Sequence, residues 1–120
     1  MKRLLLLAVV GCASVPANDP PPTLLVVDNQ HLRDAVVYVL PCGSLACPVK
    51  LGEAPGAHTV RLQVRAWQTH ADGRVYLAFA LRPDRRMASV PPVGVPHDSH
   101  VALTIASTLG QAFAYAEVDR

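Results

Sequence analysis

The chain is built from short apolar runs that alternate with the period of a β-strand and end at proline, glycine or aspartate. In the clearest run, residues 59–66, Val60, Leu62 and Val64 fall on one face while arginine and glutamine occupy the other. A side-chain period of two is typical of a half-buried strand. No window of about 11 residues combines helical apolar spacing with capping residues. The chain is therefore expected to fold from strands.

Further runs of this kind follow one another along the sequence. Strands are predicted at residues 24–27, 35–40, 48–52, 59–66, 74–82, 90–95, 101–105 and 112–118. Residues 90–95 include Pro91 and Pro92, which lack a backbone N–H, so this strand is placed at a sheet edge. Many short strands that follow one another closely along the chain fit a sandwich or a small barrel. Because the chain has only one Trp and two Phe, the core is expected to be mainly aliphatic. We predict an all-β fold, a single antiparallel β-sandwich of about seven or eight short strands.

The N-terminus has the organisation of a secretory signal. Lys2 and Arg3 precede an apolar segment at residues 4–10. That segment is shorter than the roughly 20 residues that a membrane-spanning helix needs. The alternative, a native N-terminal strand or helix, does not account for the paired cations or for the Pro-rich stretch that follows.

The apolar segment ends in Val9-Val10-Gly11-Cys12, which resembles the lipobox of bacterial lipoproteins. The resemblance implies that residues 1–11 are cleaved and that Cys12 carries a covalent lipid, with no other cofactor. One acyl chain anchors only marginally, whereas several on one cysteine hold a protein at the membrane. Ala13 follows the cysteine where the inner-membrane retention signal of enterobacterial lipoproteins has Asp. The resemblance therefore favours the outer membrane.

Residues 12–23 are expected to form a tether between this cysteine and the folded domain at residues 24–120. Pro20, Pro21 and Pro22 favour extended polyproline geometry. At about 3.1 Å per residue, such a spacer holds the domain roughly 30 Å from the lipid surface.

The charge balance changes when the signal peptide is set aside. The chain has 11 Lys+Arg and 9 Asp+Glu, and without Lys2 and Arg3 nine of each remain. A formally neutral domain gives no indication of a nucleic-acid partner.

The three cysteines leave an even pair once Cys12 is lipidated. Cys42 and Cys47 lie between two apolar runs, with four residues between them, and exported proteins meet an oxidising compartment. We predict a disulfide that closes a hairpin loop. Metal-binding or redox-active pairs are more often C-x-x-C, and two free thiols are the remaining alternative.

Residues 97–100 gather His97, Asp98, Ser99 and His100. Their simplest interpretation is a polar hairpin turn. His97 and His100 are also candidate ligands of a weak metal site, although zinc sites usually need three or four ligands. A catalytic serine needs an orienting base and an oxyanion site, and no G-x-S-x-G elbow is present. The chain is not expected to be an enzyme.

Three aromatic residues are candidates for an interaction surface: Trp67, Tyr76 and Tyr115. The single Trp of a small sandwich is more often packed in the core or at its rim, which is the expectation for Trp67. For Tyr76 and Tyr115, a binding face and the second side of a covered strand are both open.

Several landmarks resemble those of uncharacterised small bacterial lipoproteins with a transthyretin- or immunoglobulin-like β-sandwich. These are Val27-Asp28-Asn29, Val37-Tyr38-Val39, Leu51-Gly52, Val95-Pro96 and Val101-Ala102-Leu103-Thr104-Ile105. The Pro-Gly turn usual before the penultimate strand is replaced here by residues 96–100.

The resemblance carries no activity. We expect a lipid-anchored envelope protein, a non-catalytic structural or interaction module with a protein or glycan partner, whose first candidate contact is the edge at residues 90–95. The alternative hypothesis is a lipoprotein that binds a metal or small ligand through His97 and His100.

Overall fold

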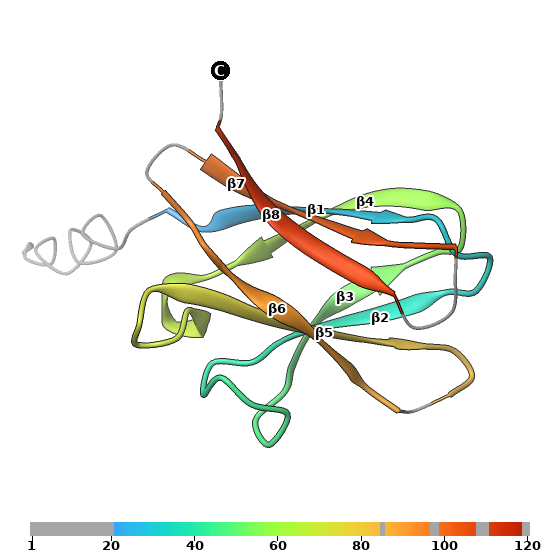
Figure 1. Cartoon of the computed structure of the whole chain (residues 1–120), viewed down its shortest axis with the longest axis horizontal. Coiled ribbons are helices and arrows are strands. Elements are labelled where there is room, and N and C mark those ends of the chain that lie inside the picture. The colour runs from blue at the N-terminus through green and yellow to red at the C-terminus, as the bar shows by residue number, and fades with distance from the viewer. Residues whose placement is uncertain (1–20, 85, 97–98, 108–110, 119–120) are drawn as a thin grey trace, which may run out of the picture.

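Eight strands form two four-stranded sheets that pack face to face (Figure 1). The structure is a computed structural model, and it describes residues 21–84, 86–96, 99–107 and 111–118. The strands are β1 (Thr23–Asn29), β2 (Ala35–Val39), β3 (Val49–Ala54), β4 (His58–Val64), β5 (Arg74–Leu81), β6 (Ala88–Gly94), β7 (Ser99–Ile105) and β8 (Ala112–Val118). The predicted all-β sandwich is confirmed. Residues 1–20, with Cys12, and His97 lie outside the described residues.

The first sheet has the strand order β4-β1-β7-β8. β1 pairs antiparallel with β4, and β7 pairs antiparallel with β8. β1 and β7 run parallel, with Leu25 opposite Val101. The sheet is therefore mixed, whereas only antiparallel pairing was predicted. The parallel pair arises because β1 and β7 are far apart in sequence, so no hairpin fixes their relative direction.

The second sheet has the strand order β3-β2-β5-β6 and is antiparallel throughout. β6 lies at its edge, as its two prolines predict. The pairing of β6 with β5 shifts register between Val75 and Leu77, at the level of Pro91 and Pro92. Such a bulge is the expected result of residues that cannot donate to a regular ladder.

The core between the sheets is aliphatic, with Phe79 as its one aromatic among the described buried residues. On β5, the residues that alternation places on the inner face are buried: Val75, Leu77, Phe79 and Leu81. Ala78 and Ala80 are also buried, although they point to the outer face. Ala78 lies opposite Tyr38 of β2 in the ladder. A neighbouring long side chain can shield so small a residue from water.

The sandwich has two ends, which differ in the connections they carry. At the near end, where β1 begins, lie the residue 40–48 loop, the connection from β4 to β5 and the end of β8. At the far end lie the loop from β1 to β2 and the turn from β3 to β4. Along one side β3 approaches β4, and along the other β6 approaches β8 (Figure 1).

Candidate interaction surfaces

The outer face of β8 presents exposed aromatic side chains. Ala112, Ala114 and Ala116 pack against the core, so the alternation of the strand points Phe113 and Tyr115 outward. Phe113 is 53% exposed and Tyr115 is 45% exposed. We call this pair the β8 aromatic pair. A pair of exposed aromatics on one strand is a feature of binding surfaces.

The neighbouring strand does not cover the β8 aromatic pair. In the ladder, Tyr115 lies opposite Ala102 and Phe113 lies opposite Thr104. Both neighbours have short side chains, which leave the ring faces open. The predicted interaction residue Tyr115 is therefore exposed, and Phe113 extends the same surface.

The edges of the two sheets differ in how well they could accept another strand. β3 and β6 both contain register shifts, and β6 carries the two prolines. β4 is regular, but Arg61 and Arg65 on or beside it are exposed. β8 is regular, contains no proline and has Glu117 as its one charged residue. Prolines, bulges and charges are the usual protection of sheet edges, and β8 has the least of it.

The cross-strand pair at the near end of this sheet joins an imidazole to a carboxylate. His100 Nε2 lies 3.0 Å from Glu117 Oε1. Within the part of the chain that the structure describes, no three or more His, Cys, Asp or Glu side chains gather as metal ligands. Because His97 falls outside it, the metal hypothesis for residues 97–100 stays a prediction.

Trp67 lies in a short 3-10 turn, η2 (Ala66–Gln68), between β4 and β5. The side chain of Gln68 is buried and its Oε1 accepts the N–H of Arg65 at 2.8 Å. Since successive residues of such a turn point in different directions, burying Gln68 turns Trp67 outward. Trp67 is 64% exposed, so the expectation of core or rim packing is wrong.

Tyr76 points from the outer face of β5 and is held by its neighbours. Its hydroxyl donates to Asp72 Oδ2 at 2.7 Å, and its ring packs edge-on against His70, with centroids 5.1 Å apart. Tyr76 is half-buried. The hydrogen bond from Tyr76 lowers the pKa of Asp72, and the same bond to the carboxylate raises the pKa of Tyr76.

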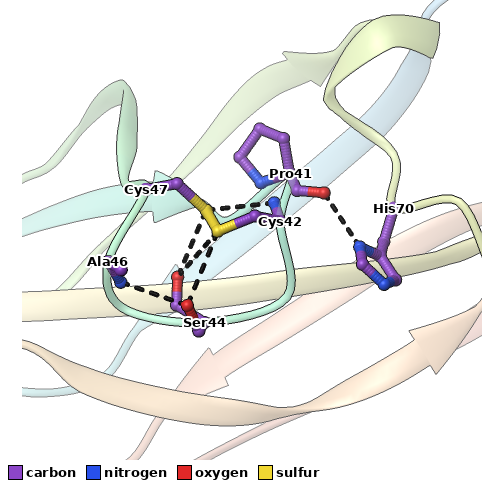
Figure 2. Close-up of a disulfide and its surroundings, with 6 residues drawn as sticks. All are labelled: Pro41, Cys42, Ser44, Ala46, Cys47 and His70. Carbon is purple, nitrogen blue, oxygen red and sulfur yellow. Dashed lines mark hydrogen bonds between the residues drawn. A yellow bond between two sulfur atoms is a disulfide. The ribbon is translucent and has the colours of Figure 1, made fainter.

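The sulfurs of Cys42 and Cys47 lie at bonding distance as a disulfide, as the sequence predicts (Figure 2). The N–H of Cys42 points at Cys47 Sγ, 3.0 Å away. His70 Nδ1 lies 2.9 Å from the carbonyl oxygen of Pro41, which joins this loop to the connection between β4 and β5 (Figure 2).

The disulfide loop also forms one wall of a shallow hollow of about 390 Å³ on the second sheet. Leu40, Tyr76 and residues 89–92 of β6 line the rest of it. The three aromatic candidates therefore lie apart: Tyr115 on the first sheet, Tyr76 on the second and Trp67 at the near end.

Asn29 lies beyond the strand predicted at residues 24–27, and sequence reasoning assigned it no role of its own. It is fully buried at the end of β1, and its amide donates to the carbonyl oxygens of Arg33 and Ala54, both at 2.9 Å. Its Oδ1 accepts the N–H of His31 at 3.0 Å. Asn29 thus fastens the far-end loop to β3. Its position two residues after Val27, on the face that Leu25 and Val27 share, was the available signal.

No protein-family model matches this sequence, and no curated protein matches it. Within the described ranges, no helix has the length and apolar character needed to cross a membrane.

Proposed function

We propose that the chain is a lipid-anchored bacterial envelope protein, a non-catalytic module that binds a protein or glycan partner. The exposed β8 aromatic pair on an edge strand free of proline is the observation that carries the interaction role. Edge strands of this kind recruit extended segments through main-chain hydrogen bonds, and side chains on their outer face add selectivity.

The anchoring role is supported by the N-terminal sequence. The lipobox-like Val9-Val10-Gly11-Cys12 stands ahead of a proline-rich stretch, and β1 begins directly after that stretch at Thr23. A cleaved and acylated Cys12 would thus be separated from the folded sandwich by the tether alone.

Two measurements test the two roles separately. The native chain should begin at residue 12 and bear acyl mass, and Cys12→Ser should move it from the detergent phase to the aqueous phase. Unchanged partitioning would contradict the anchor. For the interaction role, a photocrosslinking amino acid is placed at Phe113 in cells, with the exposed Leu32 at the far end as the matched control position. Adducts of equal yield at both positions would contradict a role for the β8 surface.

A further inference from the structure

The free edge of β8 has a defined hydrogen-bonding pattern. The N–H of Ala106 donates to the carbonyl oxygen of Gln111 at 2.9 Å, at the start of the β7–β8 ladder. In an antiparallel pair such bonded positions recur at every second residue. Phe113, Tyr115 and Glu117 therefore turn their backbone groups toward β7, in register with Gln111.

The intervening residues face the other way. Ala112, Ala114 and Ala116 direct their N–H and C=O groups away from β7, toward the edge where β8 has no ladder partner among the described strands. The bonding of β7 agrees with this alternation. The carbonyl oxygen of Ile105 faces β1 and accepts the N–H of Gln30 at 2.9 Å, whereas the next residue, Ala106, bonds toward β8. The edge thus offers main-chain donors and acceptors at three alanines.

This edge is symmetric about Ala114. Reading outward from Ala114 in either direction, the strand has an aromatic residue and then an alanine: Phe113 and Ala112 on one side, Tyr115 and Ala116 on the other. A twofold axis through Ala114 would place like beside like. Isologous interfaces require such self-complementarity.

We propose that the occupant of this edge is a second copy of the chain, paired antiparallel through β8 about Ala114. Ala112 then bonds to Ala116 of the second copy, and Ala114 bonds to its own counterpart. Phe113 falls opposite Tyr115 of the second copy on the outer face. This occurs twice, in the non-bonded positions where side chains are closest. Aromatic cross-strand pairs are among the favourable ones.

Charge and neighbouring edges are compatible with this pairing. Glu117 falls opposite Gln111 of the second copy, so no like charges meet across the seam. β6, the edge strand of the second sheet, approaches β8 on the side where the second copy would bind. Its prolines lack backbone N–H donors, so the proposed dimer pairs only the first sheets of the two copies. This inference deepens the proposed interaction role, on which it rests, by naming the partner; it does not require the lipid.

Cysteine crosslinking tests both the pairing and its register. In full chains carrying Cys12→Ser, the new cysteine is the one thiol outside the Cys42–Cys47 pair. Phe113→Cys mixed with Tyr115→Cys should form a disulfide-linked dimer under mild oxidation, because directly opposed Cα atoms lie about 4.5 Å apart. Each variant alone should crosslink at least tenfold less, since its own copies are diagonal, about 7–8 Å apart.

Two variants test the strand contact itself. Ala114→Pro removes an N–H that no described strand of the monomer pairs with, so the fold should persist while the crosslinked yield of the mixture falls at least tenfold. If that variant does not fold, an Ala114 N-methyl replacement, made by semisynthesis, removes the same donor. Leu32→Ser is the matched control and should leave the yield unchanged.

The outcomes are distinguishable. A Tyr115→Cys chain that crosslinks alone as well as the mixture overturns the register. A mixture that gives no dimer, with a monomeric mass by light scattering, overturns self-pairing. If photocrosslinks at Phe113 in cells then identify a different protein, the interaction role stands without the second copy. If they identify none, both fail.

Discussion

Asn29 couples the first strand to the rest of the far end through main-chain groups that are buried or partly buried. Its side chain satisfies a carbonyl of the β1–β2 loop, a carbonyl of β3 and one loop N–H. A buried polar group left without its partner costs about 1–3 kcal/mol. Because one side chain here bonds to several such groups, its loss would leave all of them without this partner.

Asn29→Ala is expected to lower the free energy of unfolding by about 3 kcal/mol, because it leaves these backbone groups unsatisfied. Urea denaturation followed by far-UV circular dichroism measures the change. Gln30→Ala is the matched control, since the exposed Gln30 bonds only to the side chain of Asp28 at 3.0 Å among the described contacts of its side chain. Equal effects of the two substitutions would contradict this account of Asn29.

Tyr76 and Asp72 form the pair with the clearest pH dependence. Because the pKa of Tyr76 is raised, its contribution to stability is present below pH 10.0 and is lost as pH rises through the folded-state value. Because the pKa of Asp72 is lowered, its contribution is present above pH 3.8 and is lost as pH falls through its folded-state value.

Asp72→Asn should lower the pKa of Tyr76 toward 10.0, because the amide carries no charge to oppose phenolate formation. The phenolate absorbance of the three tyrosines, titrated in the alkaline range, measures this. Tyr76→Phe identifies which part of the curve belongs to Tyr76. A Tyr76 titration that does not move in Asp72→Asn would show that the hydrogen bond is not the cause.

Among the elements, the loop between β2 and β3 is the one with a covalent constraint. Removing both Cys42 and Cys47 by alanine substitution should lower the free energy of unfolding by about 2 kcal/mol, as expected for so short a ring. Reductant should lower the stability of the wild-type chain by the same amount and leave the double variant unchanged. A fold that tolerates reduction with no change in its denaturation midpoint would contradict this estimate.

Local patterns were enough to predict the strands, because each depends on its own alternation. β4 and β5 lie where the period of two places them, and the prolines predicted the edge position of β6. The parallel pairing of β1 with β7 depends on which distant strands meet, and no local pattern encodes that.

The burial of individual side chains was harder to predict, because contacts beyond the alternation of a single strand decide it. Trp67 is exposed because its neighbour Gln68 is the residue that turns inward and bonds to Arg65. Asn29 is buried because the carbonyls of the far-end loop and of β3 surround it. That Phe113 belongs to an exposed surface became clear only from the register of β8, which places the short side chain of Thr104 opposite it.

At the scale of the whole molecule, pairing through β8 constrains how two anchored copies can lie. The twofold axis is perpendicular to the shared sheet, so the near ends of the two copies point in opposite directions. β1 has seven residues, about 23 Å at 3.3 Å per residue, whereas a tether in the expected polyproline geometry would span roughly 30 Å. Both tethers can then reach one membrane when the shared sheet lies along its surface.

Anchoring both copies in one membrane should therefore favour the pairing, because it confines them to a thin layer and raises their effective concentration. Lipidated Phe113→Cys and Tyr115→Cys chains in the same vesicles should crosslink at a total protein concentration about 100-fold below that needed for the Cys12→Ser chains in solution. The same lipidated chains placed in separate vesicles and then mixed are the control, because their copies are not confined to one layer and should need a higher protein concentration to crosslink. Crosslinking in solution but not on shared vesicles would show that the anchored copies cannot adopt this arrangement, and that the sheet stands upright on its tether.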